Sequence, residues 1–222
     1  MNRRDAIKNM TLYGAGMFLP TKLFSVEQTQ KHYHYIGLGS AGSRLVGQLY
    51  NKRLKGSFTC INDTREPELP SDVGFIRFIA PEPDKIMFGH KFYEVSDIQK
   101  DWGVPQDILA LVDGDERYVI LAGLGRFTGS YLSMQLSGLL SGESKNHIMV
   151  YTLPFSFEGR GINNIAKYTH ERIREHSETM TCNLDDITGD YGYIGLNDAF
   201  RNANEKVCLM LIMKSVIKKE RL

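Results

Sequence analysis

Cysteine is scarce in this sequence of 222 residues, which contains three: Cys60, Cys182 and Cys208. They are scattered and odd in number, without the C-x-x-C spacing of a zinc site or a redox pair. The sequence therefore predicts buried, reduced thiols and excludes a disulfide framework.

Long apolar runs are also missing, since no stretch approaches the ~20 consecutive apolar residues of a membrane-spanning helix. Charge of either sign is not in excess, with Lys+Arg 27 against Asp+Glu 26. This balance gives no bias toward nucleic acid or acidic membranes. We therefore expect neither a transmembrane span nor a nucleic-acid partner. With 42% hydrophobic and 24% charged residues, the chain suits one globular domain with a sizeable core.

The amino-terminal segment, residues 1–31, is interpreted as an extension of that domain. Arg3-Arg4 precedes a short apolar stretch at 10–20, a pattern similar to a twin-arginine export signal. The apolar stretch is short, however, and no clear A-x-A cleavage site follows it. The alternative is an amphipathic capping helix. We expect a cytoplasmic protein, with export as the alternative, because the export signal is incomplete.

From residue 32 onward, predicted strands and helices alternate. Such alternation is typical of an α/β fold with a doubly wound, mostly parallel sheet and helices on both faces, as in Rossmann-like domains. Residues 67–103 are the least readable part, and no function is assigned to them. The predicted strands span 33–38, 57–61, 74–79, 118–122, 147–152 and 179–182, and the predicted helices span 43–52, 130–140, 162–177 and 196–222.

The first glycine-rich loop follows the strand at 33–38. Its Gly37-x-Gly39-x-x-Gly42 matches a dinucleotide fingerprint, and Asp63 lies about twenty residues further on. In such a loop, backbone N–H groups approach a phosphate at a helix N-terminus. Alone, the motif favours a nicotinamide or flavin enzyme, such as an NAD-dependent oxidoreductase. A tight strand-to-helix turn without a ligand is the other interpretation.

A second glycine-rich loop, residues 123–130, follows the strand at 118–122. A Rossmann dinucleotide site does not need another phosphate loop facing the first. A mononucleotide with several phosphates would need both loops. The sequence also offers no acid or base for hydride transfer, so the oxidoreductase is the less favoured hypothesis.

Two further segments complete a series. T-x-P-F-x-F-E-G at 152–159 ends a predicted strand, and D-A-F-x-x-x-N at 198–204 opens the last predicted helix. In this order the four segments resemble the nucleotide-binding domain of the tubulin/FtsZ superfamily. The resemblance covers the chain from residue 33 onward, is most specific at 152–159, and implies that the chain binds GTP or GDP.

The resemblance assigns the phosphates of that nucleotide to the two glycine-rich loops. The family has Asn-Thr-Asp where this chain has Asn62-Asp63-Thr64, so Asp63 is expected near the phosphates and near a Mg²⁺ shared with them. The other implied phosphate-binding residues are Gly37, Gly39, Ser40, Ala41, Gly42, Gly123, Gly125, Arg126, Thr128, Gly129 and Ser130.

The ribose and the base are assigned to the later segments. By resemblance, Glu158 would accept a hydrogen bond from the ribose hydroxyls, and Arg160 would substitute for the family's arginine. Asn183 and Asn204 would recognise guanine, because an amide offers both a donor and an acceptor. Phe200 would lie against the base, on the same helix face as Asn204.

The chain departs from the family pattern at three glycine positions and in one loop. Arg126, Phe127 and Tyr131 stand where the family has glycine. A side chain there either blocks the phosphate or, in the case of Arg126, neutralises it. The glycine-rich third phosphate loop is not recognisable between 88 and 103.

Family members hydrolyse GTP when acidic residues in a loop after the long last helix of one subunit reach the nucleotide of the next. We expect residues 32–222 to form the nucleotide-binding domain ending in that helix, with the C-terminal domain absent. The expected activity is weak or absent autonomous GTP hydrolysis, with no catalytic residue identified. Expected partners are a second copy or an FtsZ-like filament that the chain regulates. A nucleotide-free interaction module on the same fold is the alternative.

Overall fold

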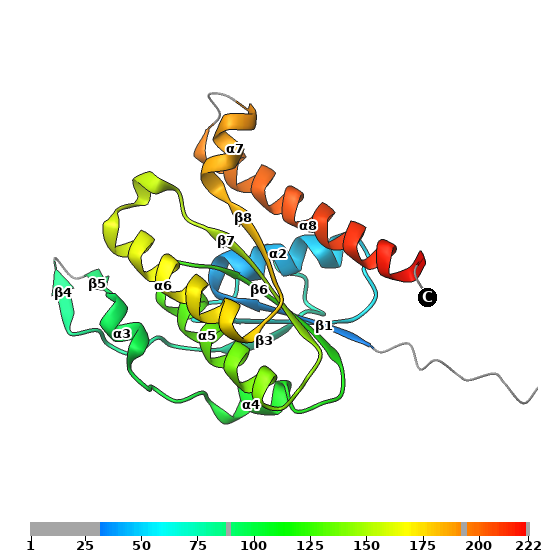
Figure 1. Ribbon diagram of the computed structural model, residues 1–222, viewed down its shortest axis with the longest axis horizontal. Helices are drawn as coiled ribbons and strands as arrows, with labels where there is room; N and C mark the ends of the chain where they lie inside the picture. Colours follow the sequence, from blue (N-terminus) through cyan, green and yellow to red (C-terminus); the bar gives the residue numbers. More distant parts are fainter. Residues whose placement is uncertain (1–31, 88–89, 192–194, 221–222) are drawn as a thin grey trace, which may run out of the picture. The chain divides into compact units, whose positions relative to one another are not determined.

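Six parallel strands form one sheet in the order β3-β2-β1-β6-β7-β8 (Figure 1). The structure is a computed structural model that describes residues 32–87, 90–191 and 195–220. The predictions for the amino-terminal segment 1–31 lie outside the described residues. The strands are β1 (Tyr33–Leu38), β2 (Ser57–Asn62), β3 (Gly74–Arg77), β6 (Arg117–Gly123), β7 (His147–Leu153) and β8 (Thr179–Asn183).

Helices cover both faces of this sheet, as the sequence predicts. Each predicted helix is present, and α2 and α5 begin three or four residues earlier than expected, directly at the glycine-rich loops. The helices are α2 (Gly39–Asn51), α3 (Val95–Gln99), α4 (Gln106–Leu111), α5 (Phe127–Gly142), α6 (Arg160–His176), α7 (Leu184–Tyr191) and α8 (Leu196–Glu220), with a 3₁₀ turn, η1 (Ser156–Glu158).

Alternate residues of each central strand face opposite sides of the sheet and enter two separate cores. Ile36 and Ile120 pack against α5 and α6, with the shorter helices α3 and α4 on the same side. Tyr35 and Val119 pack against α2, α7 and α8. Because both faces are covered, the central strands are apolar throughout, which explains why they read as continuous hydrophobic runs.

The order of the strands reverses between β1 and β6. From β1 the chain proceeds outward through β2 to β3, and then returns to β6, beside β1, before proceeding outward through β7 to β8. In an open α/β sheet, ligands bind beyond the carboxyl ends of the strands at such a reversal. Both glycine-rich loops begin there, one after β1 and one after β6.

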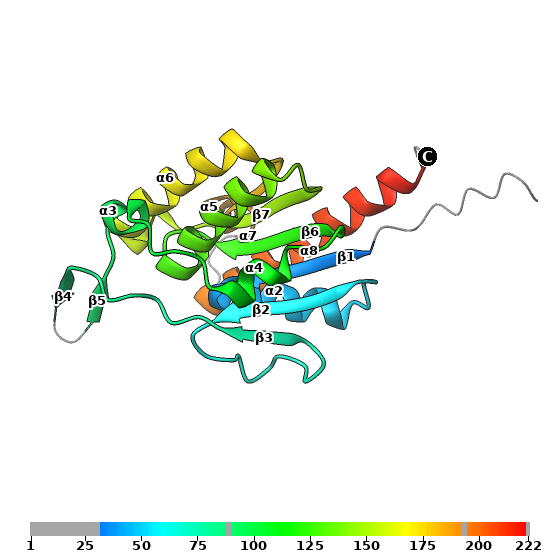
Figure 2. The ribbon, with the colours of Figure 1, turned by 90° about the horizontal axis from the view of Figure 1, so that it is seen from below.

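The region 67–103, which the sequence left without an assignment, contains a small separate hairpin. Strands β4 (Lys85–Met87) and β5 (His90–Phe92) pair antiparallel, apart from the main sheet (Figure 2). Strand β3 ends two residues before the predicted 79, and α3, α4 and α7 are short helices that the sequence did not predict. Short elements of this kind carry too few periodic positions to be recognised from sequence.

Helix α8 lies on the same face of the sheet as α2 and runs from the carboxyl edge of the sheet to its amino edge (Figure 1). Near its start Phe200 contacts Phe155, which follows β7. Further along, Leu211 lines a small hollow with Tyr33 and Ile148, near the amino ends of β1 and β7. The three cysteines are buried and free, as predicted.

Candidate functional site

The predicted site residues gather at the carboxyl edge of the sheet. Strands β1, β2, β6, β7 and β8 all end there, because they are parallel. The residues that follow them in the chain are therefore neighbours in space. The two glycine-rich loops, after β1 and β6, lie at this edge.

The glycines of the first loop have two different roles. A Cβ on Gly42 would lie 2.2 Å from the carbonyl oxygen of Leu121, and a Cβ on Gly37 would lie 2.5 Å from the carbonyl oxygen of Gly42. These two glycines allow α2 to pack closely on β6. Gly39 has a left-handed backbone (φ +67°) and faces the second loop, where a Cβ would lie 3.5 Å from the amide nitrogen of Gly129. Of the three, Gly39 is the one that faces the second loop.

The second loop is closely packed against the first. A Cβ on Gly123 would lie 2.7 Å from the Cβ of Ala41, and a Cβ on Gly129 would lie 2.2 Å from the carbonyl oxygen of Gly123. Gly125 has φ +107°, and its amide donates to the hydroxyl of Ser130 at 2.9 Å. The Gly125 amide and the Ser130 hydroxyl, both predicted to contact phosphate, are thus bonded to each other.

Phe127 and Tyr131, which replace glycines of the family pattern, lie in the core. Phe127 is 3% exposed and Tyr131 is fully buried, and their rings stack at 5.1 Å. The Tyr131 hydroxyl accepts from the amide of Trp102 (2.9 Å) and donates to the carbonyl of Gly103 (3.2 Å). These rings fasten the segment before α4 onto α5. They do not cover the face of the loop that is turned toward α2.

Arg126, the third replacement, is the residue immediately before α5. It is exposed, and its φ of −110° is one that any residue adopts, so the backbone here does not require glycine. Thr128, in the first turn of α5, is half-buried beside Gly39. The three replacements therefore do not strain the backbone of the loop, because Phe127 and Tyr131 are buried in the core and Arg126 has an ordinary φ.

The amino ends of α2 and α5 are both uncapped. Neither helix has a side-chain hydrogen bond at its N-cap, and neither has an acidic residue in its first turn. The first amides of a helix have no partner within the helix, and they carry its positive dipole end. Two such ends meet at Gly39 and Gly129, an arrangement whose electrostatics favour an anion.

Asn62 connects β2 to the first loop. Its side chain is 5% exposed and donates to the hydroxyl of Ser40 and to the carbonyl of Thr64, each at 3.1 Å. Asp63, which was predicted to lie near the phosphates, is exposed, and its carbonyl accepts from Arg77. Asn62, rather than Asp63, therefore makes the side-chain contact with the first loop. Asn62 could have been found from the sequence, because it directly follows the predicted strand 57–61 at the edge of the sheet where ligands bind.

The loop after β7 is held in place by two side chains. Glu158 accepts a hydrogen bond from the Phe155 amide at 3.0 Å, and Asn163 donates to the carbonyls of Phe155, Ser156 and Gly159 at 3.0–3.3 Å. Arg160 is exposed at the first position of α6. These bonds help to define the backbone of the loop, and the bond to the Phe155 amide is made by one carboxylate oxygen of Glu158, Oε1.

The residues predicted to recognise the base lie on β8 and α8. Asn183 is the last residue of β8, and its Oδ1 accepts from the amide of Asp185 at 3.2 Å, at the start of α7. Phe200 is half-buried with its ring at 69° to that of Phe155 and 5.5 Å away. Asn204 is half-buried one helical turn further along α8. Phe157, in the 3₁₀ turn after β7, is 68% exposed and stacks on Phe155.

Two classes of feature are absent from the part of the chain that the structure describes. No group of three or more His, Cys, Asp or Glu side chains there is arranged to hold a metal ion. Within the same ranges, no helix is both long enough and apolar enough to cross a membrane.

Comparison with known proteins identifies the fold. No family model matches the chain. Among curated proteins, the cell division protein FtsZ 2 of Pyrococcus furiosus is 24% identical over 193 residues, covering 79% of this chain and 45% of the relative. This chain thus spans about half the length of that relative.

Solved structures agree. An empty FtsZ dimer of M. jannaschii has a TM-score of 0.63 at 19% identity, covering 94% of this chain and 57% of that one. CetZ from Methanosaeta thermophila has a TM-score of 0.63 at 15% identity, covering 82% and 53%. CetZ2 from Haloferax volcanii, in a GTPγS-bound protofilament, has a TM-score of 0.60 at 16% identity, covering 81% and 57%. This chain therefore has the fold of the FtsZ/tubulin GTPase domain, and its sequence is similar to that of FtsZ 2.

Proposed function

We propose that this chain binds a guanine nucleotide, GTP or GDP, at the carboxyl edge of its sheet. The observation that carries the proposal is the meeting of two uncapped helix N-termini, α2 and α5, at Gly39 and Gly129. Each presents unpaired amides, without an acidic side chain in its first turn, to the same space. A single phosphate needs one such end, whereas a di- or triphosphate occupies both.

The remaining residues of the proposed site would contact the ribose and then the base. Glu158, in the 3₁₀ turn after β7, and Arg160, the first residue of α6, would contact the ribose, and Asn183 on β8 with Phe200 and Asn204 on α8 would contact the base. Mg²⁺, where a phosphate-bound ion is present, would be held by the exposed carboxylate of Asp63 together with phosphate oxygens and water. The resemblance to FtsZ supports guanine over other bases.

Thermal unfolding of the purified chain with GTP, GDP, ATP and NAD tests the proposal. A guanine nucleotide at a hundredfold its Kd should raise the free energy of unfolding by about 2.7 kcal/mol. NAD and ATP should have smaller effects at equal concentration. A shift with NAD but not with GTP or GDP would favour the oxidoreductase, and no shift with any nucleotide would favour an interaction module.

We further propose that this 222-residue chain by itself hydrolyses GTP weakly or not at all. The proposal rests on the resemblance, because the family's glycine-rich third phosphate loop is not recognisable in the sequence between 88 and 103, and a bound nucleotide without a positioned water keeps nearly its uncatalysed barrier. Phosphate release, measured over a range of protein concentrations with and without a full-length FtsZ, tests this. Release that rises steeply with the concentration of this chain alone would contradict it.

The same resemblance supports self-association or association with an FtsZ-like filament in the cytoplasm. FtsZ of M. jannaschii was solved as a dimer and CetZ2 as a protofilament. Analytical ultracentrifugation with and without GTP tests self-association, and co-sedimentation with FtsZ filaments tests a role as filament partner or regulator.

A further inference from the structure

We infer that Asp185 is a positioning residue for ribose recognition, which it achieves by holding the loop after β7 against the start of α7. The inference rests on the proposed nucleotide-binding function and adds a residue to those that the resemblance assigns to the site. It concerns the position of Glu158, the residue assigned to the ribose hydroxyls.

Three contacts connect Asp185 to Ser156. The Ser156 amide donates to both carboxylate oxygens of Asp185, at 3.0 and 3.2 Å, and the Ser156 hydroxyl lies 3.3 Å from Oδ1. Hydrogen bonds to an ionised carboxylate are roughly twice as strong as neutral ones. Ser156 opens the 3₁₀ turn that ends at Glu158, so this contact fixes the turn two residues from the ribose position.

Asp185 is itself held in place by its own strand and helix. Leu153 and Asn183 pair in register at the ends of β7 and β8, so the two following segments leave the sheet side by side. The Asn183 side chain then accepts from the Asp185 amide at 3.2 Å, which fixes the first turn of α7. The Asp185 carboxylate therefore spans two adjacent chain segments from a defined backbone position.

The loop is anchored from the opposite side by Asn163 on α6, through three of its carbonyls. With both anchors in place, Glu158 directs one oxygen to the Phe155 amide. Loss of the Asp185 carboxylate would remove its hydrogen bonds to Ser156 and leave those that Asn163 makes from α6. Ser156 is exposed, so water can replace the lost carboxylate at its amide without a buried unsatisfied donor.

This geometry predicts a selective effect. Loss of the Asp185 carboxylate should weaken recognition of the ribose hydroxyls and leave the phosphate contacts at α2 and α5 unchanged. Binding of GDP and of 2′,3′-dideoxy-GDP separates the two terms, because the analogue retains the phosphates and the base. In the parent chain the ratio of the two Kd values measures what the ribose hydroxyls contribute.

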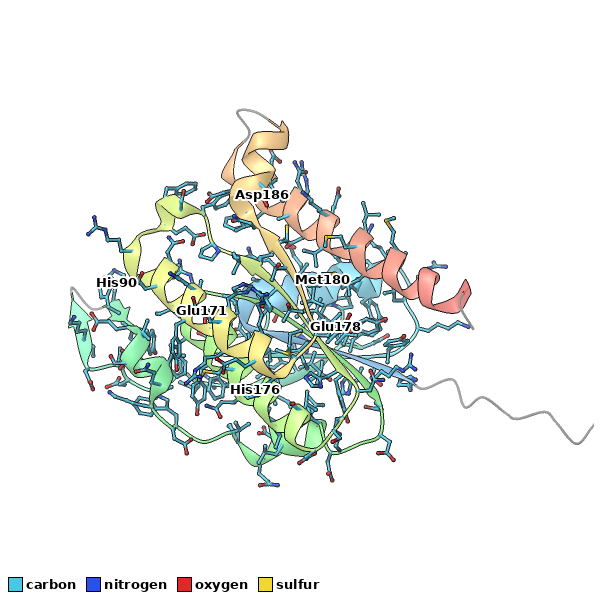
Figure 3. All side chains as sticks on the ribbon, viewed as in Figure 1. His90, Glu171, His176, Glu178, Met180 and Asp186 are labelled. Atoms are coloured by element: carbon cyan, nitrogen blue, oxygen red, sulfur yellow. The ribbon has the colours of Figure 1, made fainter. Side chains whose placement is uncertain are left out.

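The experiment is calorimetric titration of both nucleotides into the parent, Asp185→Ala, Asp185→Asn and Asp186→Asn. Asp186 is the matched control, because it is the adjacent, exposed carboxylate on α7 (Figure 3), whereas the Ser156 amide and hydroxyl bond to Asp185. We expect Asp185→Ala to reduce the preference for GDP over the dideoxy analogue by about three- to tenfold. Asp185→Asn, which keeps one acceptor oxygen, should restore part of it, and Asp186→Asn should match the parent.

Each other outcome has a definite meaning. An unchanged preference in Asp185→Ala overturns this inference alone. An equal loss of affinity for both nucleotides shows a merely structural role and overturns it as well. If the parent binds GDP and the analogue equally, Glu158 does not contact the ribose and the inference fails. If the parent binds neither, the proposed function fails with it. Should Asp185→Ala not fold, Asp185→Asn carries the comparison.

Discussion

Gly39 at the start of α2 lies directly against Gly129 in the first turn of α5, so that a Cβ on Gly39 would stand 3.5 Å from the Gly129 amide nitrogen. The two residues are ninety positions apart in the chain, and the reversal of strand order between β1 and β6 brings them together. Their contact places two positive helix ends at one point. The first prediction tests the packing that makes this contact possible.

Gly42→Ala should destabilise the fold by about 3 kcal/mol, because the new Cβ would lie 2.2 Å from the Leu121 carbonyl oxygen and α2 would have to shift away from β6. Gly138→Ala, within α5, meets no atom within 4 Å and should stabilise the fold by about 0.5–1 kcal/mol. Urea unfolding measures both. Equal effects of the two substitutions would show that α2 does not pack as described.

Arg126→Ala distinguishes the two roles that the sequence left open. The guanidinium is exposed beside the amino end of α5, and we expect it to attract phosphate. The variant should therefore bind GDP about tenfold more weakly, a change of about 1.4 kcal/mol. Arg172→Ala, which removes a cation paired with Glu175 on α6, is the control. Tighter binding by Arg126→Ala would mean that this side chain blocks the site.

Asn204→Ala should weaken guanine binding by about 1–3 kcal/mol, because the base would lose a hydrogen-bonding partner. The measured quantity is the Kd ratio between GDP and ADP, and Asn202→Ala on the same helix is the control. An unchanged ratio would remove Asn204 from the site. Asn183→Ala should lower both base selectivity and stability, since its Oδ1 also accepts from the Asp185 amide at the start of α7, a cap worth about 1 kcal/mol.

Acid should destabilise the protein through His34. Burial lowers the pKa of His34 below its ordinary 6.5, and the nearby Glu116 carboxylate opposes this only in part. The unfolded chain therefore binds the proton first, so the stability that His34 contributes is fully present well above pH 6.5 and is lost as the pH falls below it. Urea unfolding from pH 5 to 8 should show a shallower pH dependence in His34→Gln than in the parent. The same dependence in both would contradict this.

The sequence by itself determined the α/β class and the sites of the two glycine-rich loops. Apolar runs such as 118–122 are confirmed as central strands, because a strand covered on both faces is apolar throughout. The 152–159 motif likewise predicted a loop after a strand. Local composition suffices for these features, since they depend on residues adjacent in the chain.

Tertiary structure decided which chemical groups remain available for a ligand. Sequence alone left open whether Phe127 would cover the phosphate loop, and packing against Tyr131 and Tyr93 turns it into the core instead. From the sequence, no role was assigned to Asp185, whereas the adjacency of β7 and β8 brings its carboxylate to Ser156. Such assignments depend on contacts between residues far apart in the chain, and these exist only once the sheet has formed.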